Sequence, residues 1–554
     1  MSNNLDQARD SVSSDESESI RQIPLVSEDV IAPLSRLNTL RDLDTYSIID
    51  GTGHHQDLEN NIGGVGRDND NDDSNSKRNT LQDVELDEDL TTEEEDKTSQ
   101  NKFNDSGVPD KFSGPGLLAI IAVFFFNICS WGANSGYSIY LSYYLNSSLF
   151  PDVAKVDFGI IGGLNFGSGL IFGPFVNYLV GIIGLKITML IGFFFQFVGL
   201  LLASFATKLW HVYVCQAVVP GIGLALICIP NINIIPQWFQ KRRSIATGIT
   251  AAGSGVGGII FNTGMNEILE KYSFRWSLRA QAIICLVVNI CALLIFRTRN
   301  KDIKPVFNIY DKLVWLNFGV ITTVLFVIFT MLGYVTLMYN LSDFTISLGY
   351  SQQQGATVSM MVSIGIIFGR PIIGRLSDMY GPINVTMIAS FVVGIFALGM
   401  WIPCRNYATA LIFACIEGSL MGSIWVNEAA IVVSITNLKK MGIAMALLWI
   451  IVGISGFVSP IIGIELKSGL VNGERSPLQY LHPAIFDGCF YIGAGLALFV
   501  LRGWIIARNE ILEQEGEKLL KETNDPANLK LLITVPPKRA IEKMFSLKTC
   551  SIRI

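Results

Sequence analysis

Twelve long apolar runs, separated by short polar loops, occupy this chain from about residue 115 to residue 507. A helix needs about 20 mostly apolar residues to cross a bilayer, and a soluble domain cannot bury a dozen runs of that length. The pattern therefore predicts an all-α polytopic membrane protein with 12 transmembrane helices. The predicted spans are residues 115–140, 157–181, 187–207, 210–236, 245–265, 278–297, 314–339, 356–374, 384–403, 408–433, 442–464 and 484–506.

Charge is distributed unevenly along the chain, which is 50% hydrophobic and 16% charged and has a net charge of −6. Residues 1–100 contain 25 acidic and 8 basic residues, so the remainder of the chain is net basic. An acidic segment with few aromatics buries too little apolar surface to offset its ordering entropy. We therefore expect a disordered, cytosolic N-terminal tail. The predicted organisation is this tail (1–112), a six-helix bundle (113–297), a cytosolic linker (298–313), a second six-helix bundle (314–507) and a cytosolic tail (508–554).

Basic residues and a weak internal repeat predict the topology. Lys and Arg cluster in the connection after span 4, between spans 6 and 7, and in the connection between spans 10 and 11. The excess of Lys and Arg in cytoplasmic loops places both termini in the cytosol. Pro174 and Gly184 recur as Pro371 and Gly381 at an offset of 197 residues. This repeat favours two six-helix pseudo-repeats, an arrangement that places substrate sites near the membrane midplane between the halves.

Two sequence segments resemble signatures of a known family. Residues 369–381 (GRPIIGRLSDMYG) look like the loop signature of the major facilitator superfamily. Residues 237–248 (QWFQKRRSIATG), which contain Lys241, Arg242 and Arg243, resemble the loop 4–5 signature of monocarboxylate-porter-like transporters, and most closely their fungal branch, the monocarboxylate transporter homologues. The resemblance implies the major facilitator fold and secondary transport of a small organic solute by alternating access. Fungal members of this branch include riboflavin porters.

The chain also departs from that family pattern. The acidic-Gly-Gly-aromatic motif that opens span 1 in many relatives is reduced to Pro109-Asp110. The substrate-contacting Lys of the animal members aligns with Asn134, and their span-8 Asp aligns with Ile366, whereas their Arg is kept as Arg370. In the animal transporters that Lys and Asp serve proton and carboxylate coupling. The departures therefore predict a substrate other than lactate or pyruvate, either monocarboxylate-like or vitamin-like.

Four charged residues within or near the spans are candidates for substrate or proton coupling. Arg370 lies inside span 8, where a guanidinium must be paired or face a wet cavity, so it either binds an anionic group or forms a structural ion pair. Glu417 lies near the midplane of span 10 and is the one acidic residue predicted at that depth, which suggests proton coupling or structural pairing. Glu428 follows about 20° round the same helix, on one shared face. Glu428 and Asp343 are predicted near span ends.

Polar residues also form a stripe on span 1, at spacings of three and four residues. Amides facing lipid would lack hydrogen-bond partners, so the stripe lines a cavity or bonds to neighbouring helices. Its members are Asn127, Ser130, Asn134, Ser138 and Ser142.

The connection after span 8 carries a second constellation, comprising Gly369, Arg375, Asp378 and Gly381. A carboxylate beside a helix end and an adjacent Arg can pair in one conformation and separate in another. We interpret these residues as a conformational latch in a loop, with simple stabilisation of that loop as the alternative.

Other functional classes lack support in the sequence. There is no Walker-type phosphate loop, no Cys or His pair with metal-ligand spacing and no nucleophile–base constellation. We therefore expect no enzymatic activity, cofactor, metal or nucleic-acid partner, and a monomer that contacts lipid, a small-molecule substrate and coupled protons. A non-transporting sensor that signals through the acidic tail is the alternative function. The plasma membrane is the expected location, with the vacuolar membrane as the alternative.

Overall fold

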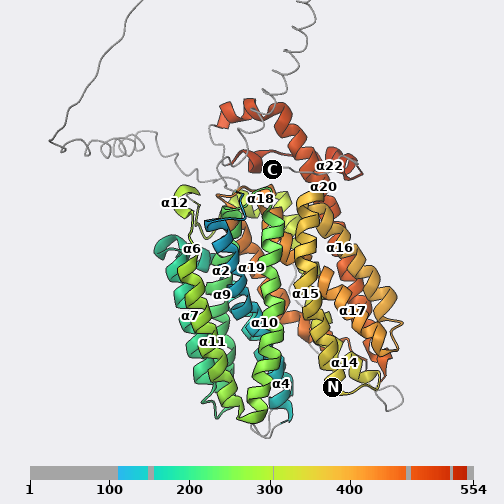
Figure 1. Cartoon of the computed structure of the whole chain (residues 1–554). Coiled ribbons are helices and arrows are strands. Elements are labelled where there is room, and N and C mark those ends of the chain that lie inside the picture. Colours follow the sequence, from blue (N-terminus) through green and yellow to red (C-terminus); the bar gives the residue numbers. More distant parts are fainter. Residues whose placement is uncertain (1–109, 147–154, 304, 469–475, 524–527, 546–554) are drawn as a thin grey trace, which may run out of the picture. The chain divides into compact units, whose positions relative to one another are not determined.

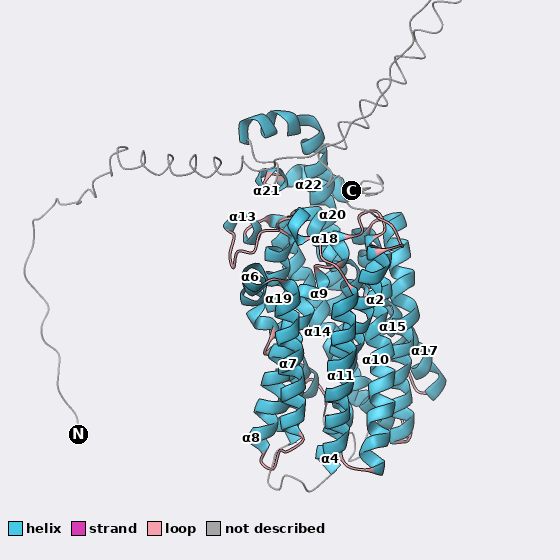
Figure 2. Ribbon diagram, turned by 60° about the vertical axis from the view of Figure 1, so that its left-hand side comes forward, coloured by secondary structure: helices cyan, strands magenta, loops and turns pink. Residues whose placement is uncertain are grey.

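The computed structural model describes residues 110–146, 155–303, 305–468, 476–523 and 528–545, which all belong to one compact unit. Every regular element in these ranges is a helix (Figures 1 and 2). Twelve helical segments are long and apolar enough to cross a membrane, as the hydrophobic pattern predicts. The predicted disordered tail lies outside the described residues, apart from its last three positions.

The first six spans include several interrupted helices. Spans 1, 2 and 4 each contain a short tight or wide helical turn, whereas spans 3, 5 and 6 are single α-helices. Their elements are α2 (Pro115–Asn127), η2 (Ile128–Gly132), α3 (Ala133–Ser135), α4 (Tyr137–Asn146), α5 (Lys155–Gly167), η3 (Leu170–Phe172), α6 (Gly173–Ile183), α7 (Leu185–Ala203), α8 (Leu209–Val212), η4 (Tyr213–Val218), α9 (Val219–Ile232), η5 (Ile235–Gln237), α10 (Arg243–Lys271) and α11 (Phe274–Ile295).

The connection between the halves contains two short helices, and the second six spans follow it. The elements are α12 (Asn300–Ile303), α13 (Lys312–Trp315), α14 (Phe318–Ser347), α15 (Gln352–Tyr380), α16 (Pro382–Phe396), η6 (Ala397–Trp401), α17 (Tyr407–Leu420), α18 (Ser423–Ile435), α19 (Met441–Glu465), η7 (Pro477–Tyr480), α20 (Leu481–Thr523), α21 (Leu529–Leu532) and α22 (Pro537–Met544). We call the end of the bundle that carries α12 (labelled in Figure 1) and α13 (labelled in Figure 2) the linker end, and the opposite end the far end.

Equivalent glycines end the second span of each half. Gly184 follows α6 with φ 86°, and Gly381 follows α15 with φ 90°. A side chain is strained in this left-handed region, so glycine stops the helix and starts the next span at both places. The sequence repeat at an offset of 197 residues therefore corresponds to one repeated turn.

The two halves meet through α10 against α15 and through α5 and α6 against α19 (Figure 1). Glycines permit the approach: a Cβ at Gly255 would lie 2.7 Å from the Ser363 carbonyl oxygen, and one at Gly167 would lie 2.7 Å from that of Gly453. The close approaches of α10 to α15 fall between Ser244 and Gly258, in the half of α10 nearest the linker end. Small residues thus let these backbones pack directly against each other.

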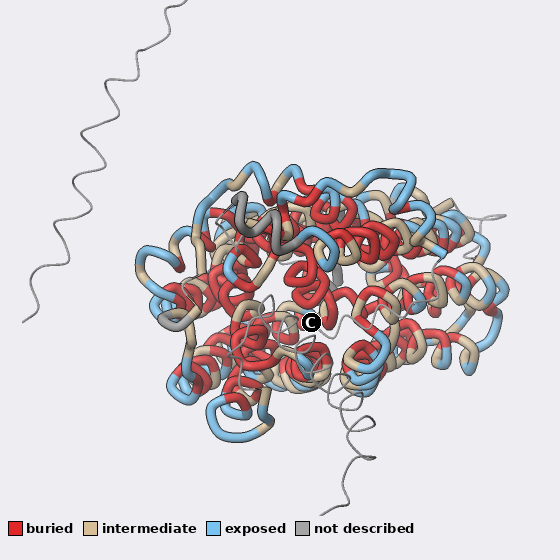
Figure 3. The backbone as a smooth tube through the Cα atoms, turned by 90° about the horizontal axis from the view of Figure 1, so that it is seen from above, coloured by how far each residue is buried: buried red, intermediate tan, exposed pale blue. Residues whose placement is uncertain are grey.

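The outward faces of the helices are apolar and exposed, whereas the buried residues face inward (Figure 3). Phe175, Phe368 and Leu294 are 60%, 66% and 77% exposed. Apolar surface of this extent is unfavourable in water and favourable against lipid chains. Together with the twelve spans, it identifies an integral membrane protein.

Several helices extend further than hydropathy predicts, and α15 and α20 are two of them. Helix α15 continues through Arg375 and Asp378 to Tyr380, so the predicted latch loop is wrong: both residues lie in the last turns of a helix that ends only at Gly381. Helix α20 continues past the predicted span end at 506 to Thr523. Beyond it, α22 packs on α20, where the Arg502 guanidinium donates to the Met544 carbonyl oxygen at 2.9 Å. Helical hydrogen bonding continues into polar sequence when such packing supports it.

Candidate functional site

A polar cavity lies among the helices of the first half. It has about 410 Å³ of empty space, part of it open to solvent. Amide and hydroxyl side chains predominate in its lining and none of the lining residues is acidic or basic. The lining residues are Ser130, Ala133, Asn134, Tyr137, Tyr140, Asn165, Gln196, Leu200, Gln216, Pro220, Leu224 and Gln281.

Hydrogen bonds between helices hold this lining in place. The Asn165 amide nitrogen donates to the Asn134 side-chain oxygen at 2.6 Å, and the Tyr140 hydroxyl donates to the Gln281 side-chain oxygen at 2.8 Å. The Gln196 side chain donates to the Cys129 carbonyl oxygen at 2.7 Å. Fixed amides of this kind present both donors and acceptors, which suits recognition of an uncharged, hydrogen-bonding solute.

The span-1 stripe divides between two roles. Ser130 and Asn134 line the cavity. Asn127 instead connects helices: its amide nitrogen donates to the Thr250 carbonyl oxygen at 2.9 Å, and its side-chain oxygen accepts from Asn231 at 3.3 Å. The side chains of Ser138 and Ser142 lie outside the described part of the structure. Both alternatives for the stripe therefore occur: some of its residues line the cavity, and another bonds to neighbouring helices.

An aromatic cluster joins the two halves. Trp131 and Phe166, which follow the cavity residues Ser130 and Asn165 in sequence, lie with ring centroids 5.4 Å apart. From the second half, Trp425 and Trp449 lie 5.5 and 6.1 Å from Trp131, and the Trp131 and Trp449 rings are nearly parallel, with an interplanar angle of 14°. We call Trp131, Phe166, Trp425 and Trp449 the aromatic cluster. Its members therefore come from both halves of the bundle.

Arg370 also connects the halves. Its side chain is 4% exposed, and its Nη1 donates to the Ala251 carbonyl oxygen at 2.8 Å and to the Ser254 hydroxyl at 2.7 Å, both on α10. Its Nε has no hydrogen-bond partner, and the Tyr334 hydroxyl is a further neighbour of the guanidinium. Among the described residues Arg370 therefore has neutral partners only, and the structural ion pair that the sequence left open is not formed.

Glu417 lies inside the second half beside a carboxyl group that the sequence reading missed. Glu417 and Asp487 both have 0% exposure, and neither has a hydrogen-bond partner. Each is close enough to the other for electrostatic interaction. Asp487 is thus a further fully buried carboxyl within a predicted span, and the depth of Glu417 in the membrane stays a prediction. A charged residue three positions into a predicted apolar span was the signal that could have identified Asp487.

Glu428 differs from its prediction in one respect, its expected shared face with Glu417. It has 0% exposure and no hydrogen-bond partner, so it is buried as completely as Glu417. The helix is also interrupted at Met421 and Gly422, between α17 and α18. Glu417 and Glu428 were expected on one face because an unbroken helix turns by 100° per residue. The break between them removes the basis for that expectation.

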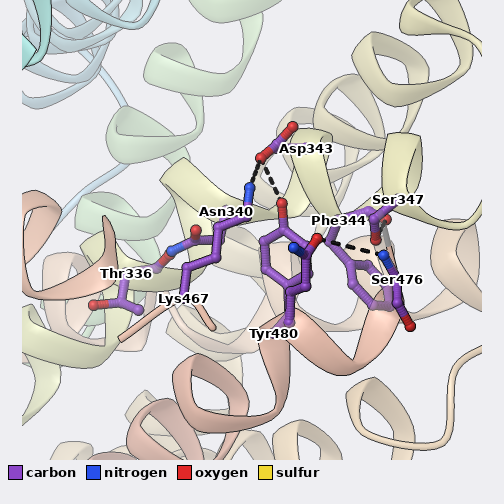
Figure 4. Close-up of polar contacts among 9 residues, drawn as sticks. Thr336, Asn340, Asp343, Phe344, Ser347, Lys467, Ser476 and Tyr480 are labelled. Atoms are coloured by element: carbon purple, nitrogen blue, oxygen red, sulfur yellow. Dashed lines mark hydrogen bonds and ion pairs between the residues drawn. The ribbon is translucent and has the colours of Figure 1, made fainter. Parts of the chain in front are cut away.

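Asp343 forms a polar contact at the far end of the second half (Figure 4). The Lys467 ammonium and the Tyr480 hydroxyl both donate to one Asp343 carboxylate oxygen. The Asp343 side chain is 43% exposed. This contact connects α14 to the segments that follow α19 and precede α20, and it lies apart from Arg370 and Glu417.

The latch residues at the linker end connect the halves in an unexpected way. The Asp378 carboxylate accepts hydrogen bonds from the backbone N–H groups of Ser244 at 2.9 Å and Ile245 at 3.0 Å, in the first turn of α10. Negative charge at a helix N-terminus is stabilising because the first N–H groups lack intrahelical partners. The partner of Asp378 in this conformation is thus the neighbouring half rather than Arg375.

The loop 4–5 signature is fixed by the residue left from the family's span-1 motif. The Asp110 side chain accepts from the backbone N–H groups of Gln240 and Arg242 at 3.2 and 3.1 Å. The Arg243 side chain donates to the Phe239 carbonyl oxygen at 3.1 Å, whereas Lys241 is exposed. Asp110 therefore orders the connection that leads into α10.

Comparison with known proteins agrees with this architecture. Residues 119–460 and 323–536 match the Major Facilitator Superfamily. The chain is 45% identical over 414 residues to the probable transporter MCH2 of Saccharomyces cerevisiae, covering 74% of this chain and 86% of that protein. Two solved folds are similar: the proton:xylose symporter XylE (TM-score 0.55, 13% identity, covering 69% and 94% of the two chains) and the E. coli fucose:proton symporter FucP (TM-score 0.52, 14% identity, covering 69% and 99%). The chain belongs to the Major Facilitator Superfamily and is a transporter of that superfamily.

Proposed function

We propose that the protein is a secondary active porter of the fungal monocarboxylate transporter homologue branch. It moves a small organic solute across the membrane by alternating access, with both termini in the cytosol. In this conformation the Asp378, Arg370 and glycine contacts between α10 and α15 keep the halves together at the linker end. With both termini in the cytosol, that closed end is the cytosolic side. The plasma membrane is the proposed location, with the vacuolar membrane as the alternative.

The substrate that we propose is vitamin-like: an uncharged, partly planar solute of the riboflavin class. The single observation that carries this proposal is the aromatic cluster, in which Trp131 of the first half stacks on Trp449 of the second half, in a bundle whose first half has a cavity with amide and hydroxyl lining. Aromatic faces bind planar rings by stacking, and the amides bind hydroxyl and carbonyl groups. A lactate or pyruvate site would need a cation for the carboxylate, and the cavity lining has none.

Substituting Trp131 tests this proposal through uptake of radiolabelled riboflavin in cells that lack their own riboflavin transport. We expect Trp131→Ala to raise the KM about tenfold, because about 1.4 kcal/mol of stacking is lost. Trp131→Phe keeps one aromatic face and should have a smaller effect. Trp210→Ala is the matched control, since Trp210 is 60% exposed and its ring contact is with its neighbour His211.

Radiolabelled lactate, supplied in parallel, distinguishes the two substrate classes. Lactate uptake that exceeds riboflavin uptake in the wild-type protein would contradict the vitamin-like assignment. Equal riboflavin KM values in Trp131→Ala and Trp210→Ala would remove the aromatic cluster from the substrate site.

A further inference from the structure

Glu417 on α17 and Asp487 on α20 both lie in the interior of the second half, and Asp487 is an electrostatic neighbour of Glu417. Both have 0% exposure. A glycine makes room for Asp487: a Cβ at Gly333 on α14 would lie 2.9 Å from one Asp487 carboxylate oxygen and 2.9 Å from the Tyr491 ring. Asp487 and Tyr491 therefore pack against α14.

None of the four carboxyl oxygens has a hydrogen-bond donor. A third group in the same state lies beside them. The Tyr491 hydroxyl, one helical turn after Asp487, is also buried without a hydrogen-bond partner, and it is an electrostatic neighbour of both carboxyls. Buried polar atoms normally have partners, so three unpartnered groups at one place point to a bound species that is missing from the contacts of the protein itself.

Among the described residues, no cation is an electrostatic neighbour of either carboxyl. The hydrophobic cluster that contains Tyr491 also includes Leu337, Val362 and Ala414. Tyr491 on α20 is a titratable neighbour of both carboxyls, and Tyr334 on α14 is a neighbour of Tyr491, whereas the residues of α16 and η6 include no titratable group. Arg370 on α15 donates to α10 instead. Two carboxylates cannot both remain charged in such a place, since each buried charge needs a partner.

We propose that Glu417 and Asp487 form a single proton-binding site, in which the two carboxyl groups exchange one proton as a unit. In the loaded form both carboxyls are protonated and the pair is neutral. Release of one proton to water leaves one carboxylic O–H, which donates to the neighbouring carboxylate, while the Tyr491 hydroxyl donates to the same carboxylate. The remaining negative charge is then held by two hydrogen bonds. This inference rests on the proposed function only for its role as the coupling site of transport.

A series of electrostatic neighbours connects the pair with the contact between the two halves. Tyr334 is an electrostatic neighbour of Tyr491 and also of Arg370. Arg370 in turn bonds to α10 of the first half. Reorientation of Tyr491 toward the deprotonated pair changes what Tyr334 faces, and thereby the environment of the guanidinium that connects the halves. Tyr491, Tyr334 and Arg370 are thus successive electrostatic neighbours between the pair and the α10–α15 contact.

Infrared difference spectroscopy of the purified full-length protein in lipid tests the proposal, with the proton itself as the probe. The carboxylic C=O stretching bands are followed as the pH is varied. In the wild-type protein we expect one band to disappear on deprotonation. Asp487→Asn and Glu417→Gln should each shift the midpoint of the remaining carboxyl by about one pH unit or more, because the shared hydrogen bond is lost. Tyr491→Phe, which keeps both carboxyls, should also shift the midpoint.

Glu428→Gln is the matched control, because Glu428 is a third buried, unpartnered carboxyl beyond the α17–α18 break. It should remove its own band and leave the midpoint of the pair unchanged. Strictly additive spectra of Glu417→Gln and Asp487→Asn would overturn the shared site. A midpoint that moves when sodium replaces choline in the buffer would also overturn it, since the bound species would then be a metal ion. The spectra require no transported solute, so failure of the proposed transport would leave this result intact.

Discussion

Arg370→Ala is expected to abolish solute uptake while the protein still inserts into the membrane and purifies as a single species. The guanidinium bonds to the Ala251 carbonyl oxygen and the Ser254 hydroxyl of the other half. Hydrogen bonds to a charged group contribute about 1.5–3 kcal/mol each, so losing two should lower uptake at least about 100-fold. Initial uptake rates, normalised to the amount of protein in the membrane, give the measurement.

Arg370→Lys and a surface control make this prediction specific. Lysine keeps the charge, but its single nitrogen cannot bond to α10 and face Tyr334 together, so uptake should be intermediate. Arg275→Ala removes an exposed arginine at the start of α11 and should transport normally. Full activity of a well-expressed Arg370→Ala variant would show that neither the solute nor the α10–α15 contact depends on this side chain.

Glu417→Gln is expected to separate exchange from net transport. Glutamine keeps the shape of the side chain and its capacity for hydrogen bonds but cannot take up a proton. Counterflow exchange of solute should therefore largely continue, whereas net uptake should lose its dependence on external pH. Net uptake is measured in vesicles at a series of external pH values with a fixed internal pH.

Asp487→Asn should reproduce the flat pH profile of Glu417→Gln, because both carboxyls belong to the proposed proton site. Asp343→Asn provides a contrast: it removes the Lys467 contact at the far end and should keep the wild-type pH dependence. A pH profile in Glu417→Gln that matches the wild type would place coupling elsewhere or indicate a uniporter.

The fold was predictable because it depends mainly on the length of the apolar runs along the sequence. The length of each apolar run decides whether a helix spans a bilayer, and all twelve spans followed from it. Helix ends were less predictable. Helix α15 runs to Tyr380 and α20 to Thr523, because packing and the glycine stop at Gly381, rather than hydropathy, decide where these helices end.

The candidate site was only partly predictable, since sequence identifies unusual residues more readily than their partners. Asn134 and Glu417 were found because polar groups are rare in spans. That Asp378 caps α10, and that Trp425 and Trp449 meet Trp131, depends on how the two halves pack. Asp487 was missed although its charge within the predicted span 484–506 was visible in the sequence.

The most direct test of the account is solute accumulation in proteoliposomes. Vesicles with the wild-type protein, vesicles with Arg370→Ala and protein-free vesicles are incubated with a metabolite extract from fungal cells under an imposed proton gradient, and their contents are identified by mass spectrometry. The account predicts that at least one uncharged, partly planar solute accumulates in the wild-type vesicles alone, and that its accumulation falls when the proton gradient is collapsed. Identical contents in all three sets of vesicles would contradict the account.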